Sequence, residues 1–113
     1  MKRLLLDENL PKQLKGYFSP NFEVVSISDL GWQSKTNGEL LIALDKADLK
    51  YLLTADRNIK FQQNLEKYAV IIVVLVLLDN RLKSLVPFVK EIEQTILDAD
   101  PTQKLIEIDL RSS

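Results

Sequence analysis

The sequence contains no cysteine and no histidine among its 113 residues. The absence of cysteine excludes disulfides, thiolate zinc sites and thiol nucleophiles. The absence of histidine removes the commonest general base, the Ser-His triads and the imidazole metal sites. Any catalysis by this chain therefore depends on carboxylate, amide, hydroxyl, Lys and Arg groups. Oxygen ligands of this kind suit hard divalent cations such as Mg²⁺ or Mn²⁺.

The chain also lacks a large excess of charge and a long apolar segment. Its 15 Lys and Arg and 16 Asp and Glu residues give a net charge of −1, so any contact with nucleic acid has to be local. The longest apolar run, residues 69–78, is too short to span a bilayer. Met1-Lys2-Arg3 leads directly into a strand-like run without the features of a signal peptide, which predicts a cytoplasmic protein.

Strand-like and helix-like segments alternate along the chain and predict a single domain over residues 1–113. The expected strands are residues 3–6, 22–28, 51–55, 69–78 and 104–110. The expected helices carry their apolar stripes in residues 10–18, 40–47, 61–68 and 85–96. Asn9 and Ser84 stand where N-caps of the first and last helices are expected.

This order of segments predicts an α/β fold, a three-layer α/β/α sandwich with a mostly parallel sheet and right-handed crossovers. We expect the second, first, third and fourth strands to lie side by side in that order, with the last strand at one edge. The first and third strands would then be neighbours. Ligands bind outside the carboxyl ends of strands in such sheets, so Asp7 and Asp56, which follow these two strands, would face one crevice.

Carboxylates at these positions suggest a metal site. Asp7 and Asp56 follow the two strands, and Glu39 lies in the first turn of the second helix. Three converging carboxylates repel one another strongly unless a cation compensates for their charge. We therefore expect Asp7, Glu39 and Asp56 to bind a divalent cation, with Glu8 and Asp79 as further candidate ligands.

Each acid also has a purely structural explanation. Short polar residues between a strand and a helix usually cap the helix, which accounts for Asp7 or Asp56 alone better than for both together. Thr36 and Glu39 have the spacing of a capping box, so Glu39 could simply reach back to the Thr36 amide. Asp79 begins a tripeptide, Asp-Asn-Arg, that is typical of a turn.

The segment after the third strand is locally basic and carries aromatic and amide side chains. Its residues include Arg57, Asn58, Lys60, Phe61, Gln62 and Gln63. A solvated helix face explains such charges, and the alternative is a track for phosphates beside the acids. Trp32, the only Trp, is expected in a loop, where it either covers the end of the sheet or anchors a partner.

Four motifs in this order resemble the small standalone PIN-like proteins, among them nuclease toxins of type II toxin-antitoxin pairs. They are LLDENLP at residues 5–11, DLGW at 29–32, NGELL at 37–41 and LTADRNI at 53–59. The resemblance covers nearly the whole chain. It implies an α/β/α sandwich whose acids gather at the carboxyl edge of the sheet, bind Mg²⁺ or Mn²⁺ and cut RNA phosphodiesters.

The resemblance also implies roles for individual residues. Asp7, Glu39 and Asp56 match the acids of the family, whereas Asn37 and Asn58 stand where relatives often have Asp. Asn brings no charge, so the affinity for the cation should fall. Of the remaining residues of the basic segment, Arg57 or Lys60 would neutralise phosphate charge, and Asn58, Gln62 and Gln63 would position it. RNA, an antitoxin protein and a second copy of the chain are the implied partners.

Two other functions fit parts of the pattern. A PIN-like fold of weak catalytic power could bind an antitoxin or nucleic acid without cutting it, which the near-neutral charge and Asn37 and Asn58 favour. A phosphoacceptor receiver domain also carries acids after its first strand and an Asp after its third. Receivers need a Lys at the end of the last strand, where this chain has Leu110 followed by Arg111.

Overall fold

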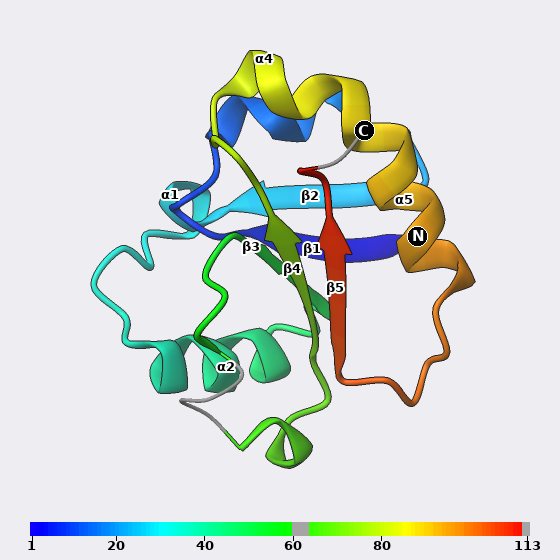
Figure 1. Cartoon of the computed structure of the whole chain (residues 1–113). Helices are drawn as coiled ribbons and strands as arrows, with labels where there is room; N and C mark the ends of the chain where they lie inside the picture. Colours follow the sequence, from blue (N-terminus) through cyan, green and yellow to red (C-terminus); the bar gives the residue numbers. More distant parts are fainter. Residues whose placement is uncertain (60–63, 112–113) are drawn as a thin grey trace.

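A five-stranded, entirely parallel sheet forms the middle of the fold (Figure 1). The computed structural model describes residues 1–59 and 64–111. The strands are β1 (Lys2–Leu6), β2 (Phe22–Ser26), β3 (Tyr51–Thr54), β4 (Ile71–Val76) and β5 (Leu105–Asp109). They lie in the order β2-β1-β3-β4-β5. The predicted fold class and strand order, including the last strand at an edge, are confirmed.

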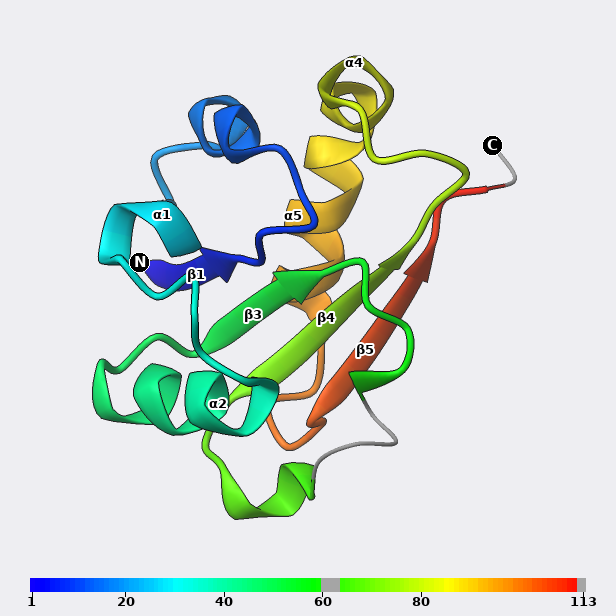
Figure 2. The ribbon, with the colours of Figure 1, turned by 90° about the vertical axis from the view of Figure 1, so that its left-hand side faces the viewer.

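Helical segments cover both faces of this sheet (Figure 2). The α-helices are α1 (Ile27–Leu30), α2 (Asn37–Lys46), α4 (Leu82–Leu85) and α5 (Val89–Asp98). The short 3₁₀ segments are η1 (Lys12–Tyr17), η2 (Leu65–Lys67) and η3 (Val86–Phe88). No helix in these described parts of the chain is long and apolar enough to cross a bilayer.

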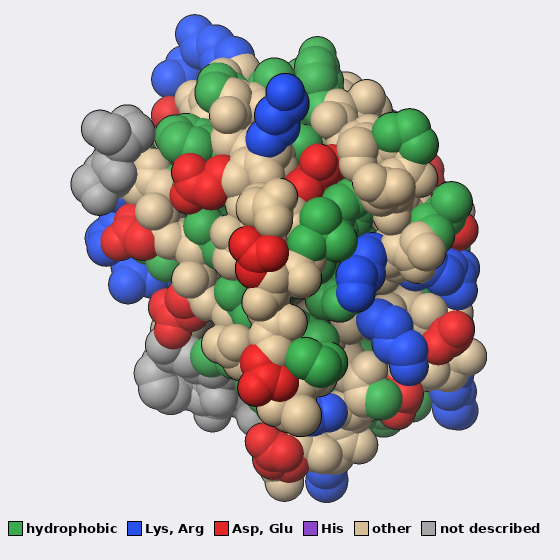
Figure 3. All heavy atoms as spheres, turned by 90° about the vertical axis from the view of Figure 1, so that its right-hand side faces the viewer, with side chains coloured by type: hydrophobic (Ala, Val, Ile, Leu, Met, Phe, Trp, Pro, Cys, Tyr) green, Lys and Arg blue, Asp and Glu red, His purple; other side chains and the backbone are tan. Residues whose placement is uncertain are grey.

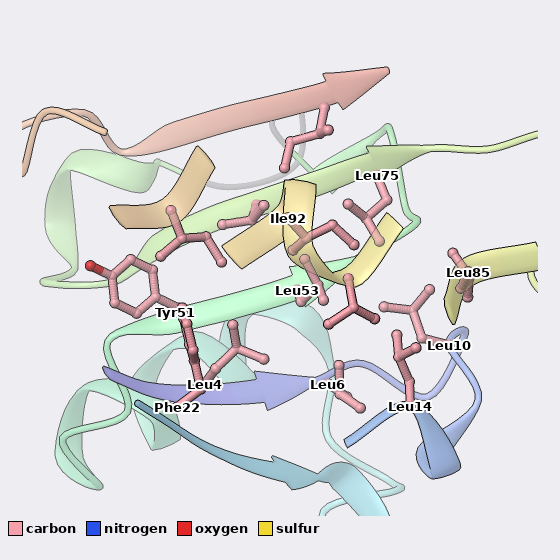
Figure 4. Packing of buried hydrophobic residues seen from close by; sticks show 14 of the residues in the cluster. Leu4, Leu6, Leu10, Leu14, Phe22, Tyr51, Leu53, Leu75, Leu85 and Ile92 are labelled. Atoms are coloured by element: carbon pink, nitrogen blue, oxygen red, sulfur yellow. The ribbon is translucent and has the colours of Figure 1, made fainter. Parts of the chain in front are cut away.

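Alternating side chains of the strands supply two apolar cores, one on each face of the sheet. Leu4 and Leu6 of β1 point to the core that η1, α4 and α5 cover, together with Leu53 of β3 and Ile92 of α5 (Figure 4). Leu5 points to the other core, which α1 and α2 cover. Because both faces of the central strands are covered, their buried positions are almost all apolar, as in most parallel strands.

The outer surface carries charges of both signs. Basic and acidic side chains are interspersed over the face shown in Figure 3, in agreement with the net charge of −1. A mixed surface of this kind gives no extended field of one sign. Recognition of a charged partner therefore depends on a local group of residues.

The expected helix caps at Asn9 and Ser84 are wrong. The residue before η1 is Pro11, which provides no side-chain cap, and the Asn9 amide binds across to β3 instead. Ser84 lies inside α4, which begins after Arg81. The expected single long helix is divided into α4, η3 and α5, because Pro87 in η3 lacks the N–H that continues a helical hydrogen-bond ladder.

The second strand is shorter than predicted, because its last two expected residues begin α1. The Ser26 hydroxyl accepts a hydrogen bond from the Asp29 N–H at 3.2 Å, and the Asp29 carboxylate accepts one from the Ser26 N–H at 2.9 Å. This capping box starts a helix that ends at Gly31 in the left-handed conformation, with φ of 69°. The spacing Ser26-x-x-Asp29 is a sequence signal that was overlooked in favour of a longer strand.

Candidate functional site

Asp7 directly follows β1 and is a buried carboxylate, with 9% of its surface exposed. Its N–H donates to the Leu53 carbonyl of β3 at 2.9 Å. One carboxylate oxygen, Oδ2, accepts from the Thr54 hydroxyl at 2.7 Å, and the other accepts from the Glu8 N–H at 2.8 Å. None of the ion pairs between described residues includes Asp7.

The Thr54 hydroxyl connects the ends of β1 and β3. Thr54 is fully buried, and its Oγ1 accepts from the Asn9 side-chain amide and from the Asp56 N–H, each at 3.1 Å. A hydroxyl has one proton and two acceptor lone pairs. Because Asn9 and Asp56 both donate, the hydroxyl proton points to Asp7. Every hydrogen-bonding position of this hydroxyl is therefore used, and its orientation is fixed.

Asn9 extends the same network to β4. Its side-chain Oδ1 accepts from the Ala55 N–H at 3.1 Å, and its backbone carbonyl accepts from the Asn80 side chain at 2.8 Å. These bonds join the carboxyl ends of β1, β3 and β4. Asn80 was expected only as a turn residue, and its contact with Asn9 depends on the packing of segments that are far apart in sequence.

Asp56 lies at the matching end of β3, next to β1 as predicted. Its N–H donates to Thr54, while its carboxylate Oδ1 accepts from the Asn58 N–H at 3.0 Å. Asp7 and Asp56 thus share one contact, the Thr54 hydroxyl. The side chain of Asp56 is half-buried and that of Asn58 is exposed.

Glu39 forms the capping box that its spacing from Thr36 predicted. Its carboxylate accepts from the Thr36 N–H at 2.8 Å, and its own N–H donates to the Thr36 hydroxyl at 3.2 Å. The Thr36 N–H, followed by the Thr36 hydroxyl, lowers the pKa of Glu39. Glu39 lines a separate hollow with Lys35 and Lys46. Within residues 1–59 and 64–111, no three acidic side chains lie where they could jointly hold a metal ion.

Asp79 is held in a turn after β4. Its carboxylate accepts from the Arg81 N–H at 2.9 Å and pairs with the Arg81 guanidinium at 3.3 Å. The Arg81 N–H, followed by the Ser84 hydroxyl, lowers the pKa of Asp79 to about 2. Asp79 lines a hollow with Leu77 and Phe88, apart from the pocket beside Asp7.

Of the expected phosphate-binding residues, Arg57 and Asn58 lie in the described part of the chain. Arg57 is exposed, and it lowers the pKa of Asp109 as the weakest of several influences. Lys60, Gln62 and Gln63 lie outside the described residues. Trp32 packs partly buried against the core beside α2, and the Lys35 ammonium lies 5.7 Å from the centre of its ring.

A pocket of about 270 Å³ opens beside Asp7, between the ends of β1 and β2. Its polar lining residues are Asp7, Glu8, Lys12, Ser26, Ser28 and Gln33. An ionised carboxylate has about four acceptor positions, of which Asp7 uses two. Mg²⁺ usually binds one or two protein carboxylates and keeps several waters. Asp7 and Glu8, which line the same pocket, therefore supply the number of carboxylates that such an ion usually binds.

Comparisons with protein-family models, with curated proteins and with solved structures gave no match. The strand order is shared by flavodoxin-like folds, which include receivers, so it does not by itself select a function. At the position where a receiver needs a free Lys, Arg111 pairs with Asp109 at 2.8 Å. The function therefore has to be argued from the residues around Asp7.

Proposed function

We propose that this chain is a PIN-like domain that hydrolyses RNA phosphodiesters with Mg²⁺ or Mn²⁺. The observation that carries the proposal is the Asp7 carboxylate, which is 9% exposed and has no cationic partner among the described residues. Burying an unpaired charge is unfavourable, even where hydrogen bonds compensate in part. A divalent cation at the open side of Asp7 supplies the missing positive charge.

The hydrogen-bonded residues Asp7, Thr54 and Asn9 have different roles in this proposal. Asp7 holds the cation, with Glu8 or Asp56 as the second carboxylate. When bound, the cation lowers the pKa of a water molecule and polarises the scissile phosphate. Thr54 fixes the Asp7 carboxylate by its hydrogen bond, and Asn9 holds the two strand ends in register. A protein base is unnecessary, in keeping with a chain that has no His.

Glu39 has a lesser role in this proposal than the resemblance implies. Its carboxylate accepts from the Thr36 N–H and lines a different hollow from the pocket beside Asp7, so it is not placed to share a cation with Asp7. Asp79 is engaged in the same way with the Arg81 N–H and guanidinium. An antitoxin partner and a homodimer follow only from the resemblance and stay predictions.

The test is cleavage of single-stranded RNA by the purified full chain with Mn²⁺. Asp7→Asn keeps an oxygen that accepts from Thr54 but removes the charge. Loss of several kcal/mol of charge stabilisation should lower the cleavage rate roughly 100-fold or more. Asp45→Asn, an exposed acid on α2, is the matched control and should cleave normally. Equal cleavage by Asp7→Asn and the wild type would exclude this function.

A binding module without nuclease activity is the second candidate. It is favoured by the capped state of Glu39 and by the uncharged side chains Asn37 and Asn58, where the resembled family often has Asp. Such a protein should bind labelled RNA or an antitoxin under saturating Mn²⁺ and leave the RNA intact. Cleavage that disappears with a chelator and with Asp7→Asn would argue against it.

A further inference from the structure

The pocket beside Asp7 combines an apolar floor with a polar rim. Its floor is formed by the buried side chains of Leu6, Leu10 and Ile27. Exposed side chains at its rim, Ser28 and Gln33, carry hydrogen-bonding groups. This combination suits a flat, uncharged group that packs on the floor and hydrogen-bonds at its edge.

The two walls of the pocket are tied together. Leu10 leads into η1 on one side, and Ile27 belongs to α1 on the other. The Lys15 ammonium of η1 pairs with the Asp29 carboxylate of α1 at 2.7 Å, and the capping box of Ser26 and Asp29 fixes the start of α1. The pocket is therefore formed before any ligand binds, which reduces the entropic cost of binding.

We propose that this pocket binds one unpaired nucleobase of the RNA, next to the phosphate that lies at Asp7. The inference rests on the proposed function and adds the part of the substrate that is recognised. Its volume of about 270 Å³ lies just below the roughly 300 Å³ at which pockets for drug-sized ligands begin. A single base fits this space, whereas a base in a duplex cannot leave its stack to enter it without unpairing.

The charges of the pocket explain why a base rather than a phosphate occupies its floor. Two acids, Asp7 and Glu8, and one basic residue, Lys12, line the pocket, so its lining has a net charge of −1 that repels an anion in the absence of a bound cation. Apart from Ser26, the buried lining side chains other than Asp7 are apolar, and a base can pack on them. The Gln33 amide both donates and accepts, so it can pair with the edge of a base. Single-stranded RNA is therefore the expected substrate.

The direct test is binding of AMP, GMP, CMP and UMP to the full chain, followed by amide NMR shifts in Mg²⁺. We expect shifts in residues 6–10 and 26–33, with one nucleotide binding more tightly than the others. Gln33→Ala should weaken the binding of that nucleotide about two- to tenfold, which corresponds to the loss of one hydrogen bond. Gln13→Ala, an exposed Gln of η1 outside the pocket lining, is the control and should bind normally.

A second variant blocks the pocket without touching the floor or the acids. Ser28→Phe fills the space from an exposed position, and Ser34→Phe places the same ring outside the lining. We expect Ser28→Phe to lose nucleotide binding and base preference in cleavage, while Ser34→Phe keeps both. If Asp7→Asn abolishes cleavage but Ser28→Phe changes neither nucleotide binding nor base preference, the proposed nucleobase site is wrong and the proposed nuclease activity stands. Nucleotide shifts in the pocket without any cleavage would support the site and overturn the nuclease.

Discussion

Thr54 is the residue on which the candidate site depends most. Its hydroxyl makes one hydrogen bond as donor and two as acceptor, and these bonds join Asp7, Asn9 and Asp56. The side chain is fully buried, so water does not replace a missing bond. A change at Thr54 therefore affects the stability of the fold and the placement of the Asp7 carboxylate together.

Two replacements of Thr54 separate the contribution of its hydroxyl to stability from that of its methyl group. Thr54→Val keeps the shape but leaves three polar groups without their partner, at a cost of about 2–4 kcal/mol in unfolding free energy. Thr54→Ser keeps the hydroxyl and loses one methyl group, which costs about 1 kcal/mol. Urea unfolding measures both values. If the two variants lose the same stability, the hydroxyl network does not hold the strand ends.

At the scale of elements, capping boxes fix the starts of two helices, α1 and α2. Thr36 and Glu39 start α2, and Ser26 and Asp29 start α1. Both boxes have the spacing that sequence alone shows. The starts of η1 and α4 are different, because the residues before them, Pro11 and Arg81, provide no side-chain cap. The position of these two segments depends on packing, which explains why the expected caps at Asn9 and Ser84 are wrong.

Glu39→Gln tests whether the cap or the cation uses this side chain. Gln also closes a capping box, so we expect the stability of the fold to stay near that of the wild type. Thr36→Ala removes the N-cap and should cost about 1 kcal/mol. We expect Glu39→Gln to lower the rate of RNA cleavage by less than roughly tenfold, whereas Asp7→Asn should lower it about 100-fold. A large loss of cleavage at full stability would show that Glu39 leaves its cap to serve the site.

The contact between η1 and α1 predicts a pH dependence. The hydrogen bond from Lys15, followed by that from the Ser26 N–H, lowers the pKa of Asp29 to about 2, from 3.8. Because the folded pKa lies below the unfolded one, the stabilisation is present above about pH 4 and is lost as the pH falls towards 2. In Lys15→Met, NMR titration should show the pKa of Asp29 moving back towards 3.8. An unchanged pKa of Asp29 would show that Lys15 does not make this contact. Lys83→Met, at an exposed position of α4, is the control.

At the scale of the whole molecule, the fold brings the carboxyl ends of β1, β3 and β4 together and buries a carboxylate there. Leu4, Leu5 and Leu6 are fully buried, so a shift of β1 by one residue would bring Arg3 or Asp7 into a position now filled by a buried Leu. This fixes the position of Asp7 at the sheet edge. A ligand that binds Asp7 only in the folded state would therefore act on the folding equilibrium of the whole domain.

Cation binding should therefore stabilise the entire domain. A ligand that binds only the folded state, at 100 times its dissociation constant, adds about 2.7 kcal/mol. For a domain of this size that corresponds to an increase in melting temperature of roughly 10 °C or more. We expect Mn²⁺ to give this increase in the wild type and in Asp45→Asn, and not in Asp7→Asn. The same increase in Asp7→Asn would place the cation elsewhere.

In the absence of a cation, Asp7→Asn should not lower the stability of the fold. It relieves the burial of a charge and retains an acceptor for the Thr54 hydroxyl, but its NH₂ group cannot accept from the Glu8 N–H, so we expect its stability to stay near that of the metal-free wild type. Thermal unfolding in a chelator measures this difference. A marked loss of stability would mean that the charge itself, and not a bound ion, is needed by the fold.

The alternation of apolar runs with helical segments was sufficient to predict the parallel sheet, its strand order and the neighbouring positions of Asp7 and Asp56. These features follow from local patterns and from the handedness of crossovers, which act alike in all such chains. The capping box at Thr36 was also readable, because its partners are three residues apart.

The tertiary structure alone decided which polar groups meet. Asn9 binds Thr54, Ala55 and Asn80 rather than capping a helix, and Glu39 stays with Thr36 instead of joining Asp7. The pocket that joins Gln33 to Asp7 depends on how η1 and α1 pack around the end of β1. Sequence specifies the path of each segment, whereas hydrogen-bond partners at short range depend on small displacements between segments, which only the packed molecule determines.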